Sequence, residues 1–213
     1  MSLPDGYSDV PAGKIATVVT SLEMHQRPRL RPDPPAEAGF GLKRVAQPDL
    51  VWFRALFRRV GEAYLWSSRL RMADEILAAE LLDPGMETYA LTRDREDLGL
   101  LQLDFRAAGM GELSFFGVAG ELIGTGAGRW LMNRALERAW SKPIRRFWVH
   151  TCTLDHPAAL EFYLRSGFTA FARQIEVFDD PRLQGYLPMG AARQVPVIHP
   201  SGTATATPAA PPA

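Results

Sequence analysis

The stretch VAGELIGTGAGRWLM at residues 118–132 decides the fold class of this chain. An apolar run of strand length ends at Val118, and Gly124, Gly126 and Gly128 then lead into an amphipathic helical pattern. Glycines leave room for a ligand beside the backbone, and the first N–H groups of a helix have no intrahelical acceptor and lie at its positive end. The stretch therefore predicts a strand, a loop and a helix start that can hold a diphosphate.

Two common phosphate-binding loops do not match this stretch. The P-loop needs glycine and lysine followed by serine or threonine, and this chain has no such tripeptide. The dinucleotide fingerprint G-x-G-x-x-G needs a glycine where Arg129 stands. That fingerprint also directly follows a strand, whereas here residues 119–123 separate Val118 from Gly124. Neither loop accounts for these glycines, which form either another kind of anion loop or a glycine-rich connection selected for packing.

The periodicity of apolar residues places this loop in a chain of alternating elements. An antiparallel run of strands comes first, and a strand–helix–strand–helix–strand run follows, which indicates a mixed α/β fold. Strands are expected at 14–24, 40–45, 87–92, 98–105, 111–118, 146–154 and 168–178, and helices from Asp49 to Tyr64 and at 73–82, 126–141 and 157–166.

Two motifs resemble those of the Gcn5-related N-acetyltransferase (GNAT) family. Residues 123–128 resemble its [QR]-x-x-G-x-[GA] acyl-CoA loop, except that Ile123 replaces the usual Gln or Arg. The segment FYLRSGF at 162–168 resembles the aromatic-Tyr-x-x-x-Gly-Phe ending of the family's downstream helix. The resemblance covers residues 40–180 and implies the GNAT acyl-CoA N-acyltransferase fold, a mixed and mostly antiparallel sheet with helices on both faces.

The resemblance implies an acyltransferase that moves an acetyl group from acetyl-CoA to an amine by direct attack on the thioester, without a metal. The alternative is a CoA-binding sensor or interaction module on the same fold without turnover, because Ile123 departs from the family's loop. Two splayed strands would expose an edge to pantetheine, and the loop would hold the diphosphate. The implied cofactor-binding residues are Phe116, Gly117, Val118, Ile123, Gly124, Thr125, Gly126, Ala127, Gly128, Arg129 and His156. Arg129 can equally be a solvated charge on the polar face of its helix.

Tyr163 and Glu112 are the candidate catalytic residues that the resemblance implies. Tyr163 stands at the position of the family's tyrosine near the CoA sulfur, where it would act as general acid; alternatively, it is a core phenol bonded to a backbone carbonyl. Some members carry a catalytic glutamate where Glu112 stands. Strand alternation puts Glu112 and Phe116 on one face, which aims the carboxylate along the cofactor channel as a base. Otherwise Glu112 is an exposed charge at a strand end.

Other polar residues have competing interpretations. His150 and His156 are rival bases, although His150 also fits a hydrogen-bonded core position and His156 a place at a helix start. Cys152 is expected to be a buried thiol, since no activating pair is evident in the sequence. The four histidines and the cysteine show no metal-ligand spacing.

Trp66 and Arg69 are candidate acceptor-binding residues because they lie between the first two helices, where the family builds its acceptor site. An aromatic residue in a helix–helix junction can equally belong to the core. The acceptor is expected to be a small-molecule amine or a protein amine, and the sequence leaves its identity and the length of the acyl chain open.

Charge and cysteine content exclude several classes of protein. The 213 residues carry 24 basic and 24 acidic side chains, and the arginines at 27, 29 and 31 lack interleaved aromatics, so neither a nucleic acid nor a membrane is an expected partner. A single cysteine excludes an internal disulfide framework. The first residues do not resemble a secretory signal, and no apolar run reaches the ~18 residues of a membrane span. The sequence therefore predicts a cytoplasmic protein.

Prolines divide the chain into three parts. Six lie in residues 1–40 and seven in 181–213, but only four lie in 41–180. We therefore expect a leader at 1–39 with an extra strand at 14–24 and a proline-rich linker, an acetyltransferase domain at 40–182, and a disordered tail at 183–213. The extra strand could pair within the chain or across a homodimer.

Overall fold

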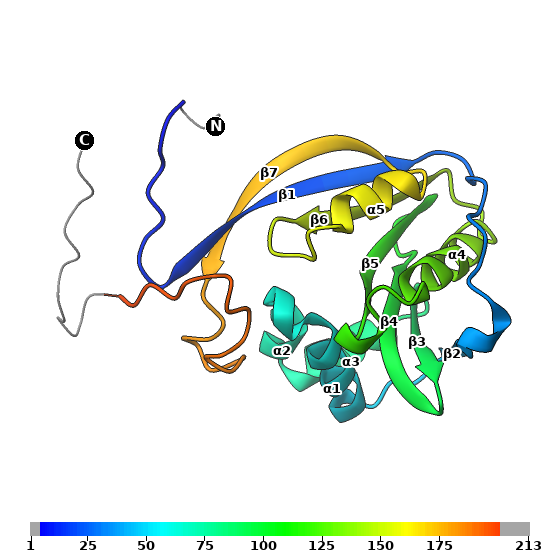
Figure 1. Cartoon of the computed structure of the whole chain (residues 1–213), viewed down its shortest axis with the longest axis horizontal. Coiled ribbons are helices and arrows are strands. Elements are labelled where there is room, and N and C mark those ends of the chain that lie inside the picture. The colour runs from blue at the N-terminus through cyan, green and yellow to red at the C-terminus, as the bar shows by residue number, and fades with distance from the viewer. Residues whose placement is uncertain (1–4, 201–213) are drawn as a thin grey trace.

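The computed structural model describes residues 5–200 and contains one seven-stranded sheet with the order β2-β3-β4-β5-β6-β1-β7 (Figure 1). All neighbouring strands are antiparallel except β5 and β6, which are parallel. The predicted mixed fold is therefore confirmed. The strands are β1 (Lys14–Met24), β2 (Gly41–Arg44), β3 (Met86–Arg93), β4 (Glu96–Asp104), β5 (Met110–Val118), β6 (Arg146–Cys152) and β7 (Thr169–Asp179).

Helices cover both faces of the sheet, as expected, and each face has its own apolar core. The α1–α3 helices pack on one face and α4 and α5 on the other (Figure 1). The first expected helix ends at Gly61 rather than Tyr64, and a short 3-10 turn follows. The helices are α1 (Leu50–Gly61), α2 (Ser68–Arg71), α3 (Asp74–Leu81), α4 (Ala127–Ala139) and α5 (Ala159–Arg165), with 3-10 turns η1 (Ala36–Ala38), η2 (Glu62–Tyr64) and η3 (Gly120–Leu122).

The two parallel strands β5 and β6 diverge after a short pairing. Only Met110–Glu112 of β5 pair with Arg146–Trp148 of β6, after which β6 continues beside β1 and β5 continues beside β4. From Leu113 onward, the edge of β5 that faces β6 has no strand partner among residues 5–200. In Figure 1, β6, β1 and β7 run across the top of the molecule while β3–β5 descend on its right side, which leaves a wedge between the two halves of the sheet.

The strand β1 has the bounds that the sequence predicts for the extra strand, and it is an integral part of the sheet. It pairs with β6 from Val19 to Met24 and with β7 from Lys14 to Glu23, so its partners lie within the chain. Leu22 and Met24 are buried in the core beneath α4 and α5. The boundary expected at residue 40 therefore separates no independent unit.

The expected disordered tail does not begin at 183. Residues 183–200 form turns, and Leu187, Ala191 and Ala192 are buried against Ile15 and the α1–α3 core. The remaining residues of that expected tail, 201–213, lie outside the described residues. Across residues 5–200 the structure has no helix of the length and apolarity that a bilayer crossing requires.

Candidate active site

A cavity of about 850 Å³ occupies the wedge between β5 and β6, and we call it the central cavity. It runs from the start of α4, past the unpaired edge of β5, to the α1–α2 connection and the inner face of β7. Ten of the eleven predicted cofactor-binding residues line it, namely Phe116, Gly117, Val118, Ile123, Gly124, Thr125, Gly126, Gly128, Arg129 and His156. The side chain of Ala127 is instead buried in the core, so only its backbone belongs to the loop.

The glycine loop presents an uncapped helix start to the central cavity. Gly124 and Gly126 have φ of 83° and 88°, in the left-handed region that favours glycine. Gly126 is the N-cap of α4 and has no side chain to bond the first N–H groups, of which that of Ala127 donates to Thr125 Oγ1 at 3.4 Å. Those groups and the helix dipole leave a site suited to an anion.

The free edge of β5 forms one wall of the central cavity. Phe116 lies on the α5 side, where its ring stacks on Phe162 with centroids 5.7 Å apart. Gly117 and Val118 continue the wall towards the glycine loop. Extended backbone without a strand partner can hydrogen-bond an amide-containing ligand as if that ligand were the next strand.

Tyr163 lies in α5 and lines the central cavity, although its residue is only 7% exposed. Its ring contacts Phe116 and Phe168 edge-on, at centroid distances of 6.2 and 5.9 Å. Burial, and secondly the nearby Asp155 carboxylate, raise the pKa of the Tyr163 phenol well above its ordinary value. The phenol therefore keeps its proton at neutral pH, as a proton donor must.

Glu112 does not lie where strand alternation predicted. The register between β4 and β5 shifts between Gln102 and Leu103, so Ser114 is an extra residue in β5. This bulge reverses the alternation and separates Glu112 from Phe116. Glu112 is not among the residues that line the central cavity, so the expected shared face is wrong.

Burial, and secondly the neighbouring Asp104 carboxylate, raise the pKa of Glu112. When a carboxyl has a higher pKa in the folded than in the unfolded state, the free energy of unfolding falls as pH rises above the unfolded-state pKa. The reason is that the folded state then binds more protons than the unfolded state. We therefore expect Glu112→Gln to raise Tm at pH 7, with the gain disappearing below the ordinary pKa of 4.5. Thermal denaturation across this pH range measures the effect. A Tm lowered by the substitution at pH 7 would contradict it.

Only one of the two predicted acceptor-binding residues lines the central cavity. Trp66 does so, and its indole Nε1 donates to Asp155 Oδ1 at 3.1 Å. Arg69 does not: both of its terminal nitrogens donate to Glu80, and its guanidinium lies over the Phe115 ring. The ion pair with α3 accounts for Arg69, so its predicted acceptor role is not supported.

The histidines and the cysteine have distinct environments. His150 is exposed on β6 and lines the central cavity, so the expected core position is wrong. His156 also lines the cavity, while its Nδ1 accepts a hydrogen bond from the Ala158 backbone at 3.1 Å. Burial raises the pKa of the Cys152 thiol, with Asp155 as the second cause. A raised pKa disfavours the nucleophilic thiolate.

Asp155 is a cavity residue that sequence reasoning missed. Its carboxylate accepts hydrogen bonds from Trp66 Nε1, from Thr151 Oγ1 at 2.8 Å and from the Cys152 backbone at 2.9 Å. Three of its roughly four acceptor positions are therefore occupied, which fixes the carboxylate at the wall of the cavity. The signal in the sequence was its place directly after the end of a central strand, where α/β sheets often carry functional side chains.

Comparisons with known proteins agree with this geometry. The sequence profile of the Acetyltransferase (GNAT) family matches residues 53–168. A search of curated proteins gives no match. Among solved structures, similarity extends to a GCN5-related N-acetyltransferase from Sphaerobacter thermophilus, with 18% identity and a TM-score of 0.58 over 82% of this chain and 53% of that chain.

Two further solved structures show the same fold. A functionally unknown conserved protein from Staphylococcus epidermidis has 14% identity and a TM-score of 0.56, over 79% of this chain and 63% of that chain. An aminoglycoside acetyltransferase from an uncultured soil metagenomic sample has 18% identity and a TM-score of 0.51, over 62% of this chain and 90% of that chain. This chain thus spans less than two thirds of the Sphaerobacter and Staphylococcus structures. Because the family profile covers more than half of the chain and includes both the glycine loop and Tyr163, the chain belongs to the GNAT acetyltransferase family.

Proposed function

We propose that this chain is an N-acetyltransferase that transfers the acetyl group of acetyl-CoA directly to an amine. One observation carries the proposal: the unpaired edge of β5, the uncapped start of α4 and the Tyr163 phenol all border one cavity. An extended thioester with a diphosphate needs this combination of an amide-binding edge, an anion site and a proton donor.

Each part of the central cavity has a separate task in this proposal. Residues 116–118 hydrogen-bond the pantetheine arm, and the backbone of residues 123–129 binds the diphosphate, with His156 beside them. Acetyl-CoA supplies an acyl group that is already activated as a thioester. Tyr163, whose phenol lines the cavity and is protonated at neutral pH, donates a proton to the departing thiolate. The raised pKa of Cys152 argues against an acetyl-cysteine intermediate and for direct transfer.

The acceptor enters from the opposite end of the central cavity, where Tyr64, Trp66 and Asp155 form the wall. A free amine is mostly protonated at neutral pH, since its pKa is ~10.4. The fixed carboxylate of Asp155 attracts the resulting ammonium and holds the nitrogen in the cavity. The ammonium gives up one proton to water before its nitrogen attacks the thioester carbonyl, since only the neutral amine is a nucleophile. The second proton that the attacking nitrogen loses replaces the one that Tyr163 gives to the departing thiolate. The acceptor is therefore an amine of a small molecule or a protein, and the reaction takes place in the cytoplasm, whose reducing conditions keep the cysteine free.

Steady-state kinetics with acetyl-CoA and a panel of amines, diamines and lysine peptides test the proposal through release of free CoA thiol. We expect Asp155→Asn to raise KM for a cationic acceptor about 10-fold or more, because a charge-assisted contact is lost. Glu161→Gln is the matched control, since Glu161 is an exposed carboxylate on α5 outside the cavity. Identical kinetics for the two variants would contradict the role of Asp155.

The sensor alternative predicts a different outcome, which calorimetry with CoA and the transfer assay distinguish together. Its support is Ile123, which is 46% exposed and stands where the family's loop carries Gln or Arg. Binding of CoA in calorimetry without transfer to any acceptor would favour the sensor. Absence of CoA binding would contradict both functions.

A further inference from the structure

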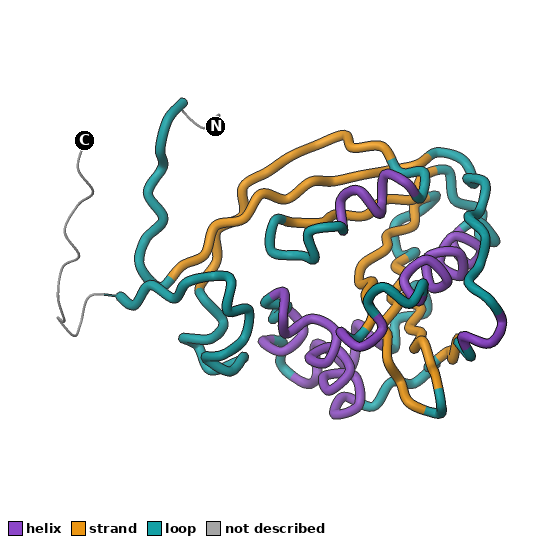
Figure 2. Tube along the Cα trace, in the orientation of Figure 1, coloured by secondary structure: helices purple, strands orange, loops and turns teal. Residues whose placement is uncertain are grey.

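The proline-rich segment 25–35 is anchored along α4 instead of forming a free linker. In Figure 2 it runs as a loop from the end of β1 down the side of the molecule, beside the helix that Figure 1 labels α4. The Asn133 amide of α4 donates to the Arg31 carbonyl at 2.7 Å and to Asp33 Oδ1 at 2.6 Å, and Arg134 donates to Asp33 Oδ2 at 2.9 Å. The residues on both sides of Pro32, Arg31 through its carbonyl and Asp33 through its carboxylate, are therefore bonded to the helix that begins at the glycine loop.

This anchoring places a second set of basic side chains beside the glycine loop. Arg31 lines the central cavity together with Arg129, and both also line a small adjoining hollow with Arg29. We call Arg29, Arg31 and Arg129 the arginine cluster. At the same loop, a Cβ on Gly126 would lie 3.2 Å from Pro34 and 3.6 Å from a terminal nitrogen of Arg129, so the segment and the Arg129 guanidinium meet over the helix start.

The arginine cluster lacks counter-charges of its own. The neighbouring Arg134 and Arg165 are paired with carboxylates of Asp33, Glu137 and Glu161. Across residues 5–200, in contrast, no salt bridge forms to any member of the cluster, and Nε of Arg129 is buried without a hydrogen-bond partner. Arg129 also lies in the first turn of α4, which contains no acidic residue, and a cation is unfavourable at that end of a helix dipole.

We propose that the arginine cluster binds a phosphate monoester, and that Arg31 of the proline-rich segment makes this site selective for the 3′-phosphate of CoA. The inference rests on the proposed function, in which the diphosphate of the same molecule occupies the start of α4. A guanidinium fork matches phosphate oxygens in two-point hydrogen bonds. The four prolines at 28, 32, 34 and 35 restrict the backbone, so the segment loses little conformational entropy when Arg31 binds.

Calorimetric titration with CoA and with 3′-dephospho-CoA tests the proposal on the full chain. We expect the unmodified protein to bind CoA about 10-fold or more tightly than dephospho-CoA, since a charge-assisted contact of this kind changes affinity by that amount. Arg31→Gln is expected to weaken CoA binding about 10-fold while leaving dephospho-CoA binding within about twofold. The Arg31 carbonyl that bonds Asn133 is retained in this variant.

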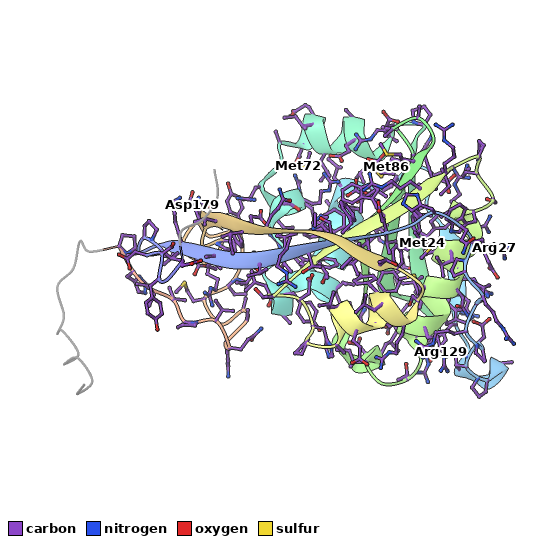
Figure 3. All side chains as sticks on the ribbon, turned by 90° about the horizontal axis from the view of Figure 1, so that it is seen from above. Met24, Arg27, Met72, Met86, Arg129 and Asp179 are labelled. Atoms are coloured by element: carbon purple, nitrogen blue, oxygen red, sulfur yellow. The ribbon has the colours of Figure 1, made fainter. Side chains whose placement is uncertain are left out.

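Arg27→Gln is the matched control, because Arg27 is an exposed arginine of the same segment that lines neither cavity. Figure 3 shows Arg27 and Arg129 at the same end of the molecule, opposite the arm formed by β1 and β7. Each of the two variants removes one positive charge from the proline-rich segment. Equal weakening of both ligands by Arg31→Gln, or equal effects of the two arginine variants, would overturn the inference while leaving CoA binding intact. Failure of the unmodified protein to bind either ligand would overturn the proposed function and the inference together.

Discussion

Replacing Tyr163 with phenylalanine is expected to lower kcat by about 10²- to 10⁴-fold, the usual contribution of a positioned general acid. The phenol is buried, lines the central cavity and has a raised pKa, so it is protonated whenever the thiolate departs. Phenylalanine preserves the edge-on packing against Phe116 and Phe168, and only the hydroxyl is lost. Single-turnover measurement of thiol release isolates the affected step from product release.

The alternative interpretation of Tyr163, as a core phenol, gives the opposite pattern. In that case Tyr163→Phe would lower Tm and leave kcat unchanged, whereas the general-acid role predicts an unchanged dissociation constant for CoA with a much reduced kcat. Tyr186→Phe is a suitable control, because Tyr186 packs against the α1–α3 core away from the cavity. A Tyr163→Phe enzyme with kcat within about twofold of the unmodified protein excludes the proton-donor role.

The second large effect is expected from Arg182→Met, which we predict to destabilise the protein by about 3–5 kcal/mol, the usual consequence of removing one partner of a buried ion pair. Arg182 and Asp180 are 1% and 3% exposed, with a 2.7 Å bond between them. Nη1 of Arg182 also donates to the carbonyls of Ala191 and Val195, at 3.1 and 2.8 Å. Methionine fills similar space but leaves both carbonyls without this donor and the Asp180 carboxylate with only the backbone N–H of residue 182. Differential scanning calorimetry should show Tm lowered by roughly 10 °C.

The pH dependence of this loss follows from Asp180. Burial alone raises the pKa of Asp180, but the hydrogen bonds from the Arg182 side chain and backbone outweigh it and hold the pKa below its ordinary value. The stabilisation is present above the unfolded pKa and is lost as pH falls through the folded pKa, so the two proteins converge in acid. Arg193→Met, at an exposed arginine of the same loop, is the control and should change stability by no more than about 0.5 kcal/mol. Equal Tm values for the Arg182→Met and Arg193→Met variants would show that the buried ion pair contributes nothing to the stability of the protein.

Local patterns in the sequence were sufficient for the elements and for the cofactor side of the candidate site. Each expected strand exists within two residues of its predicted bounds, because the alternation of apolar residues reflects burial on a sheet face. The glycine loop and Tyr163, far apart in the chain, line one cavity, as expected from the motif spacing. The sequence could not predict which face of the sheet each side chain of β5 occupies, because a bulge changes the alternation. Ser114 adds one residue to β5, and this single irregularity removed Glu112 from the face that alternation had assigned to it.

Long-range contacts explain the other differences. The composition of residues 183–213 predicts disorder, yet three carbonyls within 183–200 converge on one buried guanidinium, that of Arg182. The role of Asp155 depends on Trp66, which is distant in the sequence and contacts it only after β6 and the α1–α2 connection come together. Hydrogen bonds between residues that are distant in the sequence produce no periodic pattern from which they could be predicted.

The position of β1 has a consequence for the order in which the sheet forms. Both of its neighbours, β6 and β7, come from the last third of the described residues, with Lys14 opposite Asp179. The backbone N–H and C=O groups of β1 therefore find their native partners only in segments that follow much later in the chain. Pairing of β1 requires the closure of loops that span most of the described residues, and we expect such long-range pairing to be slow. The strands β6 and β7, which precede and follow the helix that carries Tyr163, thus gain their shared neighbour only when segments distant in the sequence meet.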